Sequence, residues 1–324
     1  MSNNMEWICS LLLSNHMWDD EFTPPRYYNM PPRYNPENIN EVSYWEEIIR
    51  FLSEKKFTAV TIEVGDGVIW DTHPEIAAPN AWSKNLFGDI LDKFRAAGIK
   101  PWPLVNFSTC HDTWIKDYRF RVGTPEYDKF VADMLDEASE LFDTPEQFHI
   151  GMDEENYEMQ VFRGFARIRH KVLYWKFVHE LIERCEKNGS RVAMYGDHCW
   201  DHPDDFVANV PKSVLISNWY YNHFKDWPVG DYNYKGQHAY EFLEKHGYDQ
   251  LPTCSTWLTN ENPMETVANL KKTIAPERLT GFQCALWARM CWDQEHYLKN
   301  DIQQLYLARR NYYPETLEKE ERKG

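Results

Sequence analysis

Three consecutive carboxylates end a short apolar segment near the middle of the chain. The segment Phe148–Met152 is followed directly by Asp153, Glu154 and Glu155. Like charges this close perturb one another, so one carboxyl group is pushed toward its protonated form at neutral pH. A protonated carboxyl group can donate a proton to a glycosidic oxygen, the leaving group in sugar hydrolysis. The alternative interpretation is structural, because acidic residues also favour the N-terminus of a helix.

Short apolar runs alternate with longer amphipathic stretches along the chain, which predicts strand–helix pairs. The expected pairs are Trp7–Leu13 with Val42–Glu54, Ala59–Val64 with Lys84–Ala97, Ile99–Val105 with Glu126–Leu141, Gln147–Gly151 with Phe165–Lys187, Arg191–Tyr195 with Asp204–Asn209, Val214–Ser217 with Ala239–His246, Thr253–Trp257 with Met264–Ile274, and Gly281–Trp287 with Gln294–Arg310. Eight pairs predict a single α/β domain, a (β/α)8 TIM barrel over residues 1–324. The charged residues from about 315 are expected to fray.

In a TIM barrel the functional residues sit at the C-terminal ends of the strands. Here those ends carry polar and aromatic side chains together. They include His16, Asp66, His111, His149, Asp197, Trp219, Trp257, Trp287 and Arg289. Polar groups that converge among flat aromatic faces are typical of a carbohydrate pocket. The alternative is that many of the 14 tryptophans and 19 tyrosines only pack the core.

One segment carries a specific family resemblance. His149-Ile150-Gly151-Met152-Asp153-Glu154 resembles the His-x-Gly-Gly-Asp-Glu signature of glycoside hydrolase family 20, the β-N-acetylhexosaminidases, with Met152 at the second glycine. Less specific similarities follow in the family's order at Lys56–Trp70, Gly98–His111, Leu215–Tyr221 and Gly281–Trp287. The resemblance spans nearly the whole chain. It implies a divergent catalytic barrel without the family's accessory N-terminal domain.

The resemblance also implies a substrate-assisted mechanism without a cofactor. Adjacent carboxylates cannot easily flank a sugar from opposite faces, but here the substrate's own 2-acetamido oxygen would attack the anomeric carbon. By resemblance, Glu154 is the general acid and Asp153 orients the acetamido group. Either Tyr220 or Tyr221 hydrogen-bonds the acetamido oxygen, and the sequence does not separate them. The walls of the acetamido pocket would be Trp287 with Trp219 or Trp257.

Two departures from the family pattern concern the far side of the sugar. The family has an arginine at the end of its first strand, where this chain reads Ser14-Asn15-His16, and a glutamate at the end of its last strand, where this chain has Arg289. Arginine suits bidentate binding of phosphate, sulfate or carboxylate. The hypothesis is an acidic or otherwise modified hexosaminide. The alternative is an ion pair between Arg289 and Asp293, Glu63 or another acid at the barrel end.

Other functions remain open. A glycosidase for a sugar without the acetamido group would need another nucleophile, such as Asp197, Glu63 or Asp66. A catalytically weak sugar-binding barrel would agree with the altered far side of the pocket. A metal site would draw on the strand-end histidines, but no HxH or HExxH spacing occurs, so no metal is expected. His149 is expected to support the acidic pair rather than to react.

Composition limits the partners and the compartment. The net charge of −16 disfavours nucleic acid and anionic membranes, because no basic stripe is present. The apolar run Ile8–Leu13 is too short for a secretory signal and lacks a preceding positive segment. Seven scattered cysteines without CxxC pairs predict reduced thiols. The expectation is a cytoplasmic protein whose partner is a carbohydrate, with a homodimer as one arrangement that would cover exposed helices.

Overall fold

The computed structural model describes residues 5–17, 39–155, 157–162, 164–165 and 167–321. Eight parallel strands in these ranges form one sheet in the order β8-β7-β6-β5-β2-β1-β10-β9. The strands are β1 (Glu6–Leu12), β2 (Ala59–Glu63), β5 (Lys100–Leu104), β6 (Gln147–His149), β7 (Arg191–Tyr195), β8 (Leu215–Ser217), β9 (Thr253–Cys254) and β10 (Gly281–Arg289). A separate short pair, β3 (Val68–Ile69) and β4 (Trp82–Ser83), lies in the loop after β2.

The sheet closes on itself where β8 meets β9. Isolated parallel bridges join Ile216 to Gln250 and Trp219 to Thr253. The Leu251 amide donates to the Ile216 carbonyl at 2.9 Å, and the Thr253 amide donates to the Asn218 carbonyl at 2.8 Å. The predicted (β/α)8 barrel is therefore confirmed, with every strand neighbour parallel.

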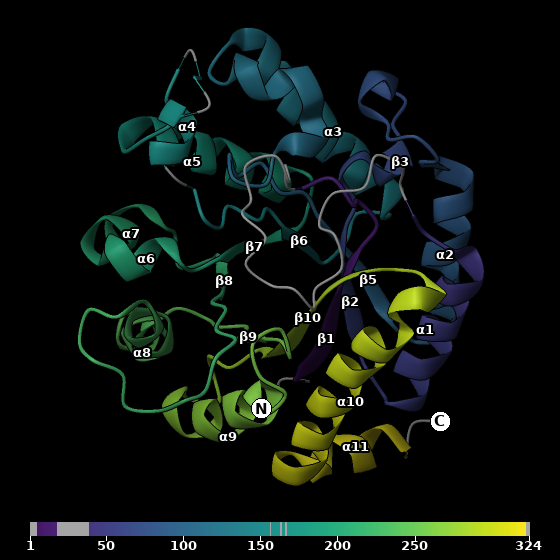
Figure 1. The fold of residues 1–324 in the computed structure, drawn as a ribbon, viewed down its shortest axis with the longest axis vertical. Coiled ribbons are helices and arrows are strands. Elements are labelled where there is room, and N and C mark those ends of the chain that lie inside the picture. Colours follow the sequence, from purple (N-terminus) through teal and green to yellow (C-terminus); the bar gives the residue numbers. More distant parts are fainter. Residues whose placement is uncertain (1–4, 18–38, 156, 163, 166, 322–324) are drawn as a thin grey trace.

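Helices surround the strands on all sides (Figure 1). They are α1 (Val42–Glu54), α2 (Lys84–Ala96), α3 (Pro125–Leu141), α4 (Tyr157–Phe162), α5 (Val172–Lys187), α6 (His198–Asp201), α7 (Pro203–Asn209), α8 (Tyr232–Lys245), α9 (Asn262–Thr273), α10 (Glu295–Tyr312) and α11 (Pro314–Glu321). Their apolar sides pack outward-facing strand residues into one large core that contains Trp7, Trp45 and Phe94. A helix needs such a packed face because propensity alone rarely stabilises it.

Several segments differ from the sequence-based expectation; helix α8, for example, begins at Tyr232 rather than at Ala239. The fourth strand ends at His149 rather than at Gly151, because the chain turns there. Helix α5 begins at Val172 rather than at Phe165. The tail expected to fray from about 315 instead forms α11, which the Arg309 side chain holds through hydrogen bonds to both the hydroxyl and the carbonyl oxygen of Thr316.

The barrel interior is layered, and the layers place the site at one end. The layer nearest the strand N-termini is apolar; it contains Ile8, Ala59, Trp102, Ala193, Leu215 and Leu251. Above it, Gln283 accepts a hydrogen bond from the Thr61 hydroxyl at 3.0 Å and donates to the Thr253 hydroxyl at 3.4 Å. Side chains two residues further along each strand point the same way. On β2 that residue is Glu63, at the C-terminal mouth of the barrel.

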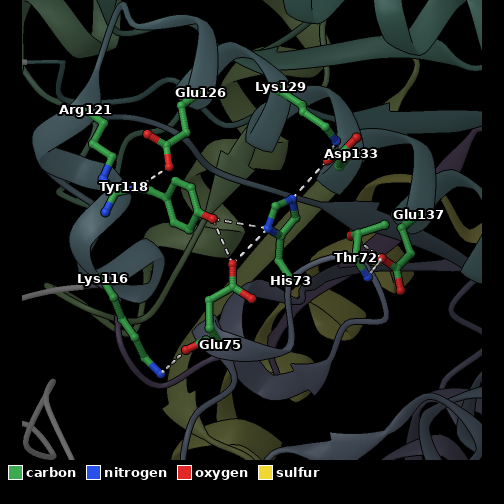
Figure 2. A network of polar contacts seen from close by, with 10 residues as sticks. All are labelled: Thr72, His73, Glu75, Lys116, Tyr118, Arg121, Glu126, Lys129, Asp133 and Glu137. Carbon is green, nitrogen blue, oxygen red and sulfur yellow. Dashed lines mark hydrogen bonds and ion pairs between the residues drawn. The ribbon is translucent and has the colours of Figure 1, made fainter.

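A polar network braces the loop after β2 against α3 and the short helix η3 (Thr113–Arg121), as Figure 2 shows. His73 lies between Glu75 and Asp133, with N–O distances of 3.0 Å to each. The Tyr118 hydroxyl donates to Glu75 at 2.8 Å, and Glu137 on α3 accepts the Thr72 amide at 3.0 Å. This network fixes η3, which begins just after the mouth residue His111.

Two further expectations concern membranes and thiols. No helix in the described part of the chain combines the length and apolar character that a bilayer crossing requires. All seven cysteines lie in described segments and are free thiols. Most are buried, so burial raises the pKa of thiols such as Cys9 and Cys185, which keeps them protonated and unreactive.

Candidate functional site

A left-handed turn after β6 carries the acidic pair. Gly151 has φ +68°, and a Cβ there would lie 2.3 Å from the side chain of Asn106, so only glycine fits. Met152 and Glu154 also have positive φ values, 70° and 51°. The Asn106 side chain accepts the Met152 amide at 2.9 Å and donates to the Asp153 carboxylate at 2.7 Å. One asparagine at the end of β5 therefore holds the turn and orients the first acid.

The two carboxylates of the pair have different environments. Asp153 is 7% exposed, whereas the Glu154 side chain is 50% exposed. The His111 Nε2 atom lies 3.3 Å from both carboxylates. Burial alone would raise the pKa of Asp153, but the His111 charge and hydrogen bonds from His111 and Asn106 outweigh it and lower that pKa. Asp153 is thus an ionised carboxylate at neutral pH.

His111 is the cation that stabilises this charge. Burial acts to lower the pKa of His111, but Asp153 and Glu154 raise it well above its ordinary value. His111 is therefore an imidazolium at neutral pH, in contact with both acidic side chains. The sequence placed His111 at the mouth, and the structure brings it into direct contact with both acids.

Asp197, at the end of β7, anchors the backbone of the second acid. Its carboxylate accepts the Glu154 amide at 2.8 Å and the Trp219 indole N–H at 3.2 Å. Burial, and then the charge of Asp153, raise the pKa of Asp197 from 3.8 to about 7. Asp197, itself held by the Trp219 indole, therefore fixes the backbone of Glu154. Both Asp197 and Trp219 are predicted site residues.

The raised pKa of Asp197 gives a pH-dependent stability that can be measured. A carboxyl group with a raised folded-state pKa contributes stability that is full below about pH 4 and is lost as the pH rises to about 7. In Asp197→Asn this loss is absent, since the amide does not titrate. Between about pH 4 and about pH 8, wild-type unfolding free energy should therefore fall relative to that of the variant, as measured by urea denaturation.

The exposed acid Asp204 offers a matched control for this titration. Asp204→Asn makes the same substitution at an exposed position of α7 and is measured over the same pH range. A constant difference from wild type for Asp197→Asn would show that Asp197 has an ordinary pKa.

Glu63 is a third acid in the mouth, at the end of β2. It is 2% exposed, and its Oε1 atom has no hydrogen-bond partner. Burial, and then the charge of Asp153, raise the pKa of Glu63 well above its usual range. Glu63 is therefore a neutral carboxylic acid at neutral pH, a hydrogen-bond donor rather than a negative charge.

These groups surround a small pocket at the barrel mouth. It is lined by Ser10, Leu12, Met17, Glu63, Leu104, Asn106, His111, Asp153, Tyr195 and Trp287. It is partly open to solvent, and its volume of about 10 Å³ is close to the space of one water molecule. A larger ligand would contact these residues from their solvent-facing side, where Glu154 is exposed.

The structure separates the two candidate tyrosines. Tyr221 is hydrogen-bonded to the Trp287 indole, and burial followed by Tyr195 raises its pKa, with a further contribution from Asp153. The Tyr220 hydroxyl instead donates to the His223 carbonyl at 2.8 Å and accepts the Trp227 indole N–H at 2.7 Å. Tyr221 thus lies beside the pocket, whereas the Tyr220 side chain, on the opposite side of the chain, is engaged with the segment that follows it.

Three other predicted residues lie near the pocket but do not line it. His149 is fully buried below it, and burial lowers the pKa of His149 to about 3. Its Nδ1 atom accepts the Gly151 amide at 3.0 Å, so the neutral ring supports the turn that carries the acidic pair. His16 and Asp66 form their own buried pair, with Nδ1 and Oδ2 2.7 Å apart.

The remaining predicted residues follow β9 and β10. Trp257 is half-buried in the turn after β9 and is not among the residues that line the pocket. Trp287 lines the pocket, and Arg289 follows two residues later at the end of β10. The third consecutive carboxylate, Glu155, has a structural role, because it forms a buried ion pair with Arg169 at 2.9 Å.

Sequence reasoning missed three residues of the site. Asn106 and Tyr195 line the pocket, and both directly follow or end a predicted strand, which is the signal that marks them. Tyr232, at the start of α8, was not predicted. The residue is 57% exposed, and its ring centroid lies 5.1 Å from that of Trp200 and 6.3 Å from that of Trp219. Burial of the hydroxyl group, and then the charge of Glu154, raise the pKa of Tyr232. The local sequence does not indicate that Tyr232 lies near the site, because the barrel fold alone places the start of α8 beside Trp200 and Trp219.

Metal chemistry has no candidate ligand set in the described segments. There, no group of three or more His, Cys, Asp or Glu side chains is arranged to hold an ion. The strand-end histidines are engaged with acids or backbone groups instead, as His16 and His149 illustrate.

Solved structures of glycoside hydrolase family 20 have the same barrel. A structure from a study of the tandem GH20 catalytic modules of the pneumococcal exo-β-D-N-acetylglucosaminidase StrH aligns with a TM-score of 0.63 at 14% identity, over 96% of this chain and 86% of that chain. The β-N-acetylhexosaminidase of Bacteroides fragilis NCTC 9343 aligns with a TM-score of 0.61 at 12% identity, over 96% and 71%. A mutant Streptomyces plicatus β-hexosaminidase in complex with its product GlcNAc aligns with a TM-score of 0.63 at 11% identity, over 95% and 68%.

The chain therefore has the catalytic-barrel fold of family 20, in a divergent form. No family model matches the sequence. No curated protein matches it either. At identities of 11–14% the similarity establishes the fold alone, so the chemistry has to be argued from the residues at the barrel mouth.

Proposed function

We propose that this protein is a glycosidase that removes a terminal 2-acetamido sugar by substrate-assisted, retaining catalysis. The observation that carries the proposal is the contrast within the acidic pair. Asp153 is buried and ionised beside His111, while Glu154 is exposed on the same turn. Two adjacent acids in different environments suit two different roles. The fold shared with β-N-acetylhexosaminidases supports the same substrate class.

In the proposed first step the acetamido oxygen attacks the anomeric carbon, and the glycosidic C–O bond breaks. Glu154, protonated, gives its proton to the departing oxygen. The ionised Asp153 accepts a hydrogen bond from the acetamido N–H and stabilises the positive charge that develops there. In the second step water attacks the anomeric carbon, Glu154 takes its proton, and the acetamido group is restored with retained configuration.

The other acids of the mouth are poor substitutes for the acetamido nucleophile. Glu63 holds a proton, Asp66 is bonded to His16 and to the Ser14 hydroxyl at 2.7 Å each, and Asp197 accepts two N–H groups. A protonated or fully hydrogen-bonded carboxyl group is a weak nucleophile. This observation favours a substrate that carries its own nucleophile over a sugar without the acetamido group.

The neighbouring tyrosines provide a matched test. The wild type should release p-nitrophenol from an aryl N-acetyl-β-glucosaminide or galactosaminide, but not from the corresponding aryl β-glucoside. Tyr221→Phe should lower kcat by about 10- to 100-fold, because a hydrogen bond to the acetamido oxygen would be lost in the transition state. Tyr220→Phe removes a hydroxyl group that bonds His223 and Trp227 instead, so it should lower thermal stability and leave kcat within about threefold.

The two variants also define what would contradict the proposal. Equal losses of kcat in Tyr220→Phe and Tyr221→Phe would remove Tyr221 from the site. Hydrolysis of the aryl β-glucoside at a similar rate would exclude substrate assistance. Folded wild-type protein that binds GlcNAc without cleaving either acetamido glycoside would identify a sugar-binding barrel.

A further inference from the structure

Arg289 is a cation at the barrel mouth whose side chain has no ion-pair or hydrogen-bond partner among the residues that the structure describes. Its Nε atom is buried and makes no hydrogen bond, and no ion pair to Arg289 occurs within the described residues. Apart from the exposed Arg310, every other arginine in the described ranges contacts a carboxylate or carbonyl oxygen. A buried guanidinium N–H without an acceptor is costly, which points to an acceptor supplied by a ligand.

The position of Arg289 relates it to the pocket. It ends β10 two residues after the pocket-lining Trp287. The register of β10 with β1 shifts here, but Leu286, Ala288 and Met290 all pack in the large core outside the barrel, so Trp287 and Arg289 face the other way, toward the barrel interior. In the sheet register Leu12, another lining residue, is paired with Arg289 on one side and with Glu63 on the other. Arg289 therefore lies at the level of the pocket mouth, separated from Glu63 by the width of one strand.

The acids of the mouth do not account for this cation. Asp66 is paired with His16, Asp153 with His111 and Asn106, and Asp197 with two N–H groups. The expected alternatives, ion pairs of Arg289 with Glu63 or Asp293, do not form. Glu63 in its neutral form adds no negative charge beside Leu12, so the mouth is less repulsive to an anion than its composition suggests.

We infer that Arg289 binds an oxyanion carried by the sugar, a carboxylate, sulfate or phosphate group attached through O3, O4 or O6 and so away from the scissile bond. The planar guanidinium presents several N–H donors that match two oxygens of such a group, whereas a neutral hydroxyl would leave most of them unused. This inference rests on the proposed function, because it names the class of 2-acetamido sugar that the same pocket takes.

The test measures the affinity of wild-type protein for product sugars by isothermal titration calorimetry. The probes are N-acetylglucosamine, its 6-sulfate, its 6-phosphate and N-acetylmuramic acid, which separate sulfate, phosphate and carboxylate. At least one anionic sugar should bind about tenfold tighter than N-acetylglucosamine. In Arg289→Met this ratio should fall to about one, and in Arg310→Met, the same change on an exposed arginine of α10, it should persist.

Each outcome decides the inference. A wild-type ratio near one, or a ratio that survives in Arg289→Met, would overturn the role of Arg289 while the proposed function stands. Failure of all four sugars to bind would overturn both. If Arg289→Met does not fold, the wild-type ratio measured at low and at high ionic strength replaces it. A ratio carried by a guanidinium should fall several-fold with added salt, and one that does not change would exclude a charge interaction.

Discussion

Replacing Glu154 with glutamine is expected to lower kcat/KM for an aryl N-acetyl-β-glucosaminide by about 10²–10⁴-fold, the usual contribution of a general acid. Glutamine keeps the shape of the side chain but cannot protonate the leaving oxygen. The side chain is 50% exposed, and its backbone amide is held by Asp197, so the fold should not change. Steady-state release of p-nitrophenol, together with circular dichroism and a thermal melt, measures both parts of this expectation.

The size of the loss should depend on the leaving group. A 2,4-dinitrophenyl glycoside needs little protonation, so its hydrolysis by Glu154→Gln should fall much less than that of the p-nitrophenyl glycoside. Glu158→Gln, a matched change on an exposed glutamate of α4, should leave both rates at wild-type values. Equal losses for the two leaving groups would mean that Glu154 acts through binding or structure rather than as the acid.

Asp153→Asn is expected to lower kcat by about 10²–10³-fold with a smaller change in KM, since an electrostatic contact made mainly in the transition state is lost. The variant removes the ionised carboxylate beside a developing positive charge. It also removes the principal anionic neighbour of His111, so the pKa of His111 should fall. The variant's pH–rate profile should therefore shift to lower pH, which a purely structural defect would not produce.

The controls for Asp153→Asn follow from its burial. Because Asp153 is 7% exposed and hydrogen-bonded to Asn106, its thermal stability has to be reported beside kcat. Asp204→Asn, on the exposed face of α7, should leave kcat unchanged. A loss of less than about threefold in folded Asp153→Asn would exclude the electrostatic role.

The barrel could be predicted from the sequence because its signal is repeated. Each buried parallel strand reads as a short apolar run and each covering helix as an amphipathic stretch, and eight repeats reinforce one another. The fourth strand ends at His149, two residues before the Gly151 that the sequence predicts. The run of positive φ values there depends on the Asn106 side chain, which comes from another strand. A contact between segments so far apart leaves no local signal.

The candidate site was predictable only to the level of strand ends. That rule located Asp153, Glu154, His111 and Asp197, because the barrel brings all its strand ends to one face. It could not choose between Tyr220 and Tyr221, since the side of the chain that faces inward depends on register with β9. It also placed Arg289 at the mouth without showing whether an acid would pair with it.

Met152, in the turn after β6, has a consequence for how the native state fluctuates. A left-handed methionine costs about 1–2 kcal/mol relative to its preferred backbone geometry, and the Asn106 side chain is what holds it there. Free energy stored in one turn is released when that turn opens, even if the barrel stays intact. The turn that carries both acids should therefore open locally at a lower free-energy cost than unfolding of the whole barrel. A ligand that binds Asp153 in the closed turn would raise the free energy of this local opening, so the turn would become more rigid as substrate occupancy rises.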